Sequence, residues 1–146
     1  MPVKPGMSKD EIIKILEAEI GANVKDKKIM RECVKDASPE QTFETIMAWG
    51  YNQRPDAKQK LATTTAIFQF IITGETGGDW QVKVDKGNLT VEKGKAPKAN
   101  CTITMAINDW KDMSAGKLDP QAAFMAGKIK FAGDMSLAMK LGALLA

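Results

Sequence analysis

The chain has 146 residues, of which 44% are hydrophobic and 27% charged, a balance typical of a globular domain that can bury its own core. Its formal charge of +3 suits acidic lipid surfaces or weak nucleic-acid contact and requires neither. The chain contains no histidine, which removes the commonest general base and most zinc sites, and no apolar run of about 18 residues, so no membrane-spanning helix is predicted.

Two helices are predicted at the start of the chain, over residues 8–21 and 25–37. The first begins with a capping box formed by Ser8 and Glu11, and an apolar stripe at helical spacing follows it. The leader, residues 1–7, lacks the apolar core of a secretory signal, so we expect no signal peptide.

The two cysteines, Cys33 and Cys101, lie far apart in the sequence and form no CxxC pair. We therefore predict two reduced thiols buried as small apolar groups rather than a disulfide. Because reduced cysteines are typical of proteins inside the cell, we expect a cytoplasmic location.

A third helix is predicted to begin at Ser38, with Pro39 at its first position and Gln41 closing a second capping box, and to end near Gly50. A break follows around Pro55. From residue 63 the pattern changes to alternating apolar and polar residues. It predicts four strands that form an antiparallel sheet covered on one side, in segments 63–74, 80–84, 89–94 and 101–107.

Helices return after the fourth strand. Asn108 and Asp119 are predicted to cap two of them, and a short strand over residues 128–133 follows. Asp134 is predicted to cap a last helix that is almost entirely apolar. This order of elements predicts an α+β fold with helices on one face of a sheet.

Three patterns suggest binding chemistry, and each has a simpler explanation. The glycines of "GETGGD" join two strands, whereas a phosphate loop needs a helix after its strand, so a hairpin is favoured. Asp109 and Asp112 lack a third ligand, which favours a solvated helix face over a metal site. Phe68 and Phe70 share the apolar face of their strand, which indicates core packing and no nucleic-acid binding. We predict no catalytic set, metal site or cofactor.

The stretch "GKLDPQAAFMAGKIKFAGDMSLAMKL", together with "FQFIITG" and the alternating "WQVKV" hairpin strand, closely resembles the sterol carrier protein type 2 (SCP-2) domain, the nonspecific lipid-transfer family. The resemblance covers residues 38–146 and leaves residues 1–37 as an added helical extension. It implies a five-stranded, mostly antiparallel sheet with helices on one face and a hydrophobic tunnel between them, closed by the last helix. The chain ends in "LLA" instead of a Ser-Lys-Leu type of address, so a peroxisomal destination is not expected.

The resemblance also implies non-enzymatic binding and transfer of fatty acids, fatty acyl-CoA, sterols or phospholipids. Methionine is frequent in the last third of the chain, which fits either an ordinary core or a wall that re-packs around its ligand. We predict Gln121 either as a head-group contact or as an exposed first-turn residue. The predicted ligand-binding wall comprises Phe70, Ile103, Met105, Met113, Phe124, Met125, Phe131, Met135, Met139 and Leu141.

Partners beyond the lipid are left open by the sequence. Outward lysines at positions 83, 128 and 130 would orient the domain on an anionic membrane surface. As an alternative, residues 8–37 would dock a partner enzyme. In another, the chain would be an accessory protein that presents a lipid to an enzyme, for example in isoprenoid quinone biosynthesis.

Overall fold

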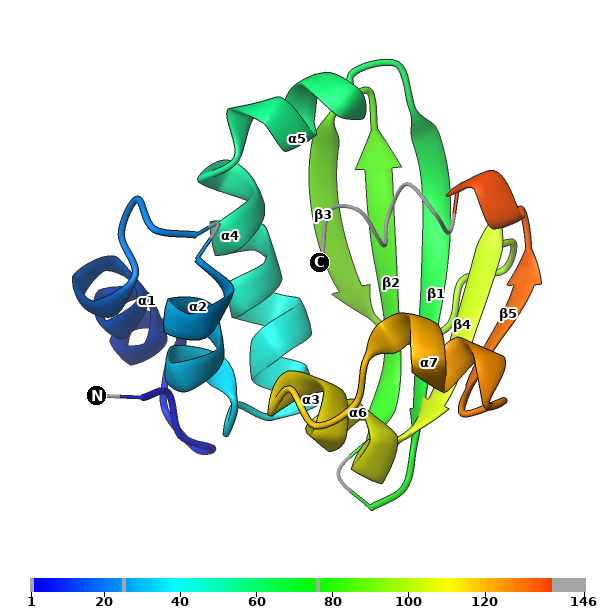
Figure 1. Ribbon diagram of the computed structural model, residues 1–146. Helices are drawn as coiled ribbons and strands as arrows, with labels where there is room; N and C mark the ends of the chain where they lie inside the picture. The colour runs from blue at the N-terminus through cyan, green and yellow to red at the C-terminus, as the bar shows by residue number, and fades with distance from the viewer. Residues whose placement is uncertain (1, 25, 76, 138–146) are drawn as a thin grey trace.

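A computed structural model describes residues 2–24, 26–75 and 77–137. Its strands form one five-stranded sheet in the order β3-β2-β1-β4-β5, with helices packed on one face (Figure 1). Three of the four neighbouring pairs are antiparallel, and β1 and β4 are parallel. The strands are β1 (Thr65–Thr73), β2 (Gly78–Asp85), β3 (Asn88–Lys93), β4 (Cys101–Ala106) and β5 (Ile129–Gly133). The predicted five-stranded, mostly antiparallel α+β fold is confirmed.

The predicted antiparallel arrangement of the first four strands is wrong at one connection. Strand β4 does not continue beside β3 but pairs with β1 in parallel. The chain therefore has to cross the sheet between β3 and β4, and residues 94–100 make this crossing on the face opposite the helices that the structure describes. Gln69 holds the crossing: its Nε2 donates to Gly94 O at 3.1 Å and its Oε1 accepts the Ala96 N–H at 2.7 Å. An alternating pattern predicts a strand but not its neighbours, so the sequence did not reveal this crossing.

The N-terminal helices are α1 (Lys9–Glu19) and α2 (Lys27–Val34), and both predicted helices are confirmed. The capping box of Ser8 and Glu11 is present, as is that of Ser38 and Gln41 at the next helix. That helix runs without a break from 39 to 52 and changes type along its length: α3 (Pro39–Gln41), a π-helical turn η1 (Thr42–Ile46) and α4 (Met47–Asn52). We call it the central helix. The short helix α5 (Pro55–Lys60) follows it.

The central helix lies between two hydrophobic clusters. Phe43 and Tyr51 belong to the cluster between the helices and the sheet. Ile46 and Trp49 belong to a second cluster, which the N-terminal extension completes with Ile12, Leu16, Ile20 and Cys33. Figure 1 accordingly shows α1 and α2 on the side of α4 that faces away from the sheet. The extension therefore has a core of its own, shared with the central helix.

The remaining helices are α6 (Ile107–Ser114) and α7 (Pro120–Met125). The predicted cap at Asn108 is wrong, because α6 already begins at Ile107 and Ala106 occupies the N-cap. The cap at Asp119 is confirmed, since its carboxylate accepts the Ala122 N–H at 3.0 Å. The Asp134 carboxylate likewise accepts the Ser136 N–H at 3.0 Å, but most of the last helix that it was predicted to cap lies outside the residues that the structure describes. Among the residues described, no helix has both the length and the apolar composition needed to cross a bilayer.

Candidate functional site

The sheet side of the predicted wall faces the helical layer. Phe70, Ile103 and Met105 are buried there, and Phe70 and Ile103 are direct neighbours in the parallel pair of β1 and β4. Phe43, from the central helix, covers this wall: its ring centroid lies 4.9 Å from that of Phe70 and 5.0 Å from that of Trp80, with the Trp80 ring nearly parallel. Sequence reasoning placed Phe43 on a helix but could not show which side chains it contacts.

On the helix side of the predicted wall, only some of the residues face the core. Met113 and Phe131 are half-buried and pack against the core. The prediction that Met125 faces inward is wrong, because its side chain is 80% exposed, and Phe124 and Met135 are 42% and 45% exposed. The reason lies in α7, a short helix in which Ala123 is fully buried, whereas the two residues after it are exposed.

Phe124 still contacts Phe131, with ring centroids 5.0 Å apart and an edge-to-face geometry. Three members of the predicted site cannot be placed in this way. The side chain of Gln121 and the residues Met139 and Leu141 lie outside the part of the chain that the structure describes. Their contacts with a ligand therefore stay predictions, as do those of the other predicted wall residues.

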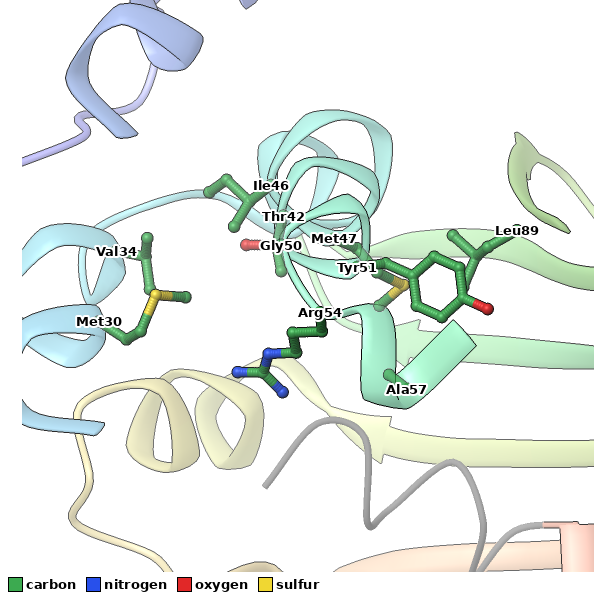
Figure 2. A pocket seen from close by; sticks show the side chains of 10 residues that line it. All are labelled: Met30, Val34, Thr42, Ile46, Met47, Gly50, Tyr51, Arg54, Ala57 and Leu89. Carbon is green, nitrogen blue, oxygen red and sulfur yellow. The ribbon is translucent and has the colours of Figure 1, made fainter. Parts of the chain in front are cut away.

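The structure adds a pocket of about 190 Å³ that the sequence analysis missed. It lies where α2 meets the central helix, α5 and β3, and we call it the junction pocket (Figure 2). Its lining includes Met30 and Val34 from α2, Met47 and Tyr51 from α4, and Leu89 from β3. Most of these side chains are apolar, so the pocket suits a hydrocarbon group.

One stripe of the central helix forms the floor of the junction pocket. Thr42, Ile46 and Gly50 line it at a spacing of four residues, which places them along one face of the helix. Arg54, the N-cap residue of α5, also lines the pocket just beyond the end of that helix. A Cβ atom built at Gly50 would meet no atom within 4 Å, so this position opens into free space. Glycine inside a helix destabilises it by roughly 0.5–1 kcal/mol relative to alanine. Gly50 therefore lowers the stability of the helix at the position where a larger side chain would enter the pocket.

Two polar side chains at the pocket are held by backbone carbonyl groups. The Tyr51 hydroxyl donates to Gly87 O at 2.7 Å, which ties α4 to the β2–β3 hairpin, and burial raises the pKa of this phenol. Arg54 Nη2 donates to Val24 O at 2.9 Å, in the loop between α1 and α2. The pocket thus combines an apolar lining with one permanently charged guanidinium.

The signals that could have revealed this pocket were present but weak. Met30 and Val34 on α2, and Met47 and Tyr51 on α4, are spaced i,i+4, but the sequence analysis singled out neither pair as a site and ended the predicted helix near Gly50, before Tyr51. Only the packing of the extension against the central helix brings the two pairs together. No local pattern encodes that contact.

Catalytic chemistry finds little support in the described residues. Among them, no group of three Cys, Asp or Glu side chains could hold a metal ion. Cys33 and Cys101 are free and buried, and burial raises the pKa of both thiols, which makes them poor nucleophiles.

Of the predicted outward lysines, Lys83 pairs with Glu92 at 3.0 Å, whereas Lys128 and Lys130 are exposed.

Comparisons with a family model and with known proteins point to the same family. The family model described as "SCP-2 sterol transfer family" matches residues 45–146. The chain is 40% identical over 111 residues to hydroxysteroid dehydrogenase-like protein 2 of Xenopus laevis, covering 73% of this chain and 25% of that protein. It is also 40% identical over 89 residues to human sterol carrier protein 2, covering 59% of this chain and 16% of the relative. The chain thus spans a quarter or less of the length of these relatives.

Solved structures agree with the fold. The sterol carrier protein domain 2 of Helicoverpa armigera has a TM-score of 0.53 and 30% identity, with 82% of each chain covered. A mutant of the sec-alkyl sulfatase PisA1 shares the fold at a TM-score of 0.58 and 23% identity, over 76% of this chain and 16% of that one.

Proposed function

Because this chain belongs to the SCP-2 sterol transfer family, we propose that it binds single lipid molecules and moves them between membranes without making or breaking covalent bonds. The observation that carries this proposal is the apolar junction pocket, a cavity within a fold whose family name refers to sterol transfer. The candidate ligands are fatty acids, fatty acyl-CoA, sterols and phospholipids. The proposal keeps the cytoplasmic setting expected from the reduced cysteines.

Hydrocarbon burial supplies enough free energy for such binding. Each methylene transferred from water to a dry site contributes about 0.8 kcal/mol, so a long acyl chain binds well with few polar contacts. One methylene more or less changes affinity by only about 1–3 kcal/mol, which predicts broad selectivity among chain lengths. The methionines at positions 30 and 47 add to this breadth, because their unbranched side chains re-pack at low cost.

Delivery requires contact with a membrane, and the region around α7 and β5 supports that role. Phe124, Met125 and Met135 expose apolar side chains there, and Lys128 and Lys130 supply positive charge at the same edge of the sheet. Apolar side chains beside lysines favour binding to an anionic lipid surface. Sedimentation with vesicles rich in phosphatidylserine should show binding that high salt weakens.

The direct test uses delipidated protein. A ligand present at 100 times its Kd stabilises the folded state by about 2.7 kcal/mol, so palmitate, oleoyl-CoA or a sterol should raise the melting temperature. Mass spectrometry of the organic extract of freshly purified protein should identify a co-purified lipid. A melting temperature that none of these ligands changes, together with an empty extract, would contradict the proposal.

A second candidate function is lipid presentation to an enzyme. It is favoured by the lengths of the relatives, because the matched region makes up only 25% of hydroxysteroid dehydrogenase-like protein 2. In this version the polar outer faces of residues 8–37 contact the enzyme. Affinity purification from native cells, with and without substitutions on those faces, distinguishes the two functions.

A further inference from the structure

The junction pocket is built from two parts of the chain. The family match begins at residue 45, whereas Met30 and Val34 belong to α2, in the extension. These two side chains face the central helix and α5 across the pocket (Figure 2). The extension therefore supplies one wall, and the pocket is incomplete without it.

Gly50 keeps the pocket open. It lies within α4, and neither its backbone conformation nor a close neighbour requires a glycine, since a Cβ atom there would meet nothing within 4 Å. Any larger side chain at this position would extend into the space between α2 and the central helix. The glycine thus has no packing role of its own, and its effect is to leave room for another group.

The size of the space favours one chain over a ring system. At about 190 Å³ the pocket is smaller than the roughly 300 Å³ at the lower end of sites for drug-sized ligands. It exceeds the ~150 Å³ of an apolar cavity that holds benzene. An unbranched alkyl chain can place part of its length in such a space and leave the rest in the opening, and it needs less enclosed volume than a rigid fused-ring sterol.

The charge beside this space favours an acid. Arg54 is the N-cap residue of α5, just after the end of α4, and its guanidinium lies between Met30 on one side and Ala57 and Tyr51 on the other (Figure 2). A guanidinium is always ionised, and its attraction for an anion grows as apolar surroundings exclude water. Its five N–H donors allow it to keep the bond to Val24 O and also approach a carboxylate.

We infer that the junction pocket binds the alkyl chain of a single-chain lipid acid, with the acidic group beside Arg54 and α2 completing the wall. The inference rests on the proposed function and deepens it, since it names the ligand class and the place. It also gives the N-terminal extension a role in ligand binding.

The first test fills the space. Gly50→Ala, Gly50→Leu and Gly50→Phe in the full chain should weaken laurate binding in order of side-chain volume, with a loss on the order of tenfold or more for Phe. Asn52→Phe is the matched control, because it adds the same side chain to an exposed position of the same helix and should leave laurate affinity unchanged. Isothermal titration calorimetry gives the affinities.

A thermal melt separates plugging from misfolding. Replacing a helical glycine raises helix propensity, so the ligand-free Gly50 variants should melt no lower than the wild-type chain. Lower affinity with retained stability is a result that a purely structural role of Gly50 does not produce. Unchanged laurate affinity in a folded Gly50→Phe variant would overturn the inference.

The second test concerns the head group. The wild-type chain should bind laurate on the order of tenfold more tightly than lauryl alcohol, because one charge-assisted contact differs between them. Arg54→Gln should remove this preference, and Lys60→Gln, at an exposed lysine of α5 that does not line the pocket, should retain it. Laurylamine should bind more weakly than either probe.

The wild-type comparison of probes decides the head-group question even if Arg54→Gln fails to fold. Equal affinity for laurate and lauryl alcohol would overturn the acidic head group. If the wild-type chain binds no lipid at all, the proposed function itself fails. If it binds lipids but the Gly50 variants bind them equally well, only the inference about this pocket fails.

Discussion

Gln69 is the buried polar residue that fixes the path of the chain across the sheet. Its amide Nε2 donates to the carbonyl oxygens of Trp80 at 3.2 Å and Gly94 at 3.1 Å, and its Oε1 accepts the N–H of Ala96. A buried amide needs such partners, since an unpaired polar group in the interior costs about 1–3 kcal/mol. The side chain therefore exchanges water for the backbone of the crossing segment, residues 94–100, and holds that segment on the sheet.

We expect Gln69→Glu to make stability depend on pH. The new carboxyl would face two carbonyl oxygens in a buried site, so its pKa in the folded chain would rise above the unfolded value. A raised folded-state pKa means that the stability is present below the unfolded pKa and is lost as pH rises through the folded pKa. Urea unfolding should show a loss of about 1–3 kcal/mol relative to wild type near neutral pH, and a smaller loss near pH 4.

Gln53→Glu is the control, because Gln53 is exposed and should show neither loss. Equal destabilisation of Gln69→Glu at both pH values would contradict this account of Gln69.

The two cysteines should react slowly in the folded chain. Both are buried, and burial raises the pKa of each thiol, so the thiolate fraction at mildly alkaline pH is smaller than for a free cysteine. Native Cys33 and Cys101 should react with iodoacetamide at least ~100-fold more slowly than the urea-unfolded chain, because alkylation waits for local opening. Mass spectrometry of quenched samples measures both rates, and fast labelling of either native thiol would contradict the burial.

At the scale of elements, the central helix connects the two hydrophobic clusters through opposite faces. Phe43 packs on Phe70 and Trp80, whereas Ile46 and Trp49 pack against the extension. Phe43 and Ile46 both belong to the π-helical turn η1, which widens the backbone by one residue. Such turns are rare and are frequent at functional sites, and here the turn also carries Thr42 and Ile46 of the junction pocket.

Phe43→Ala should be among the more costly substitutions in the chain. Removing a buried phenylalanine loses hydrocarbon burial and leaves a cavity, which typically costs about 3–5 kcal/mol. Phe124→Ala makes the same chemical change at a side chain that is 42% exposed, so its loss should be clearly smaller. Urea unfolding of both variants compares them, and equal losses would contradict the role given to Phe43 as the cover of the sheet.

The sequence predicted elements better than it predicted their partners. Helix starts at Ser8, Ser38 and Asp119 follow from capping chemistry that is local, so they were predicted correctly. The parallel pairing of β1 with β4 depends on a loop path that no periodicity records. Part of the predicted wall, such as Phe70, lies on the buried face because alternation identifies that face, whereas Met125 is exposed because α7 touches the sheet mainly through Ala123. The junction pocket depends on the docking of α2, which is tertiary information.

At the scale of the whole molecule, the extension and the family domain share a core and are not simply attached end to end. Ile46 and Trp49, from the domain, are buried in the same cluster as Leu16 and Ile20, from the extension. Polar contacts join the same parts: Gln41 Nε2 donates to Lys4 O at 2.8 Å, and Arg54 Nη2 donates to Val24 O. The apolar stripe of α1 is therefore covered by the chain's own residues, and the faces left for a partner are polar.

Deleting residues 2–37 should therefore destabilise the rest of the chain. The truncation would expose Ile46 and Trp49 together, and adjacent exposed apolar side chains favour self-association. It would also remove Met30 and Val34 from the junction pocket, so laurate binding should weaken even in the fraction that stays folded. Size-exclusion chromatography and urea unfolding of the truncated and full chains measure the first effect, and calorimetry measures the second.

A matched variant distinguishes the effect of exposing these two apolar side chains from a general loss of the fold. Ile46→Gln with Trp49→Gln should return the truncated chain to a single monomeric species, because water solvates the amides, whereas the same pair should destabilise the full chain by burying amides in an apolar cluster. The opposite signs are the expected signature of a shared core. A truncated chain that is monomeric, as stable as the full chain and equal to it in laurate affinity would show instead that residues 38–146 form an independent domain, with the extension free to serve a partner.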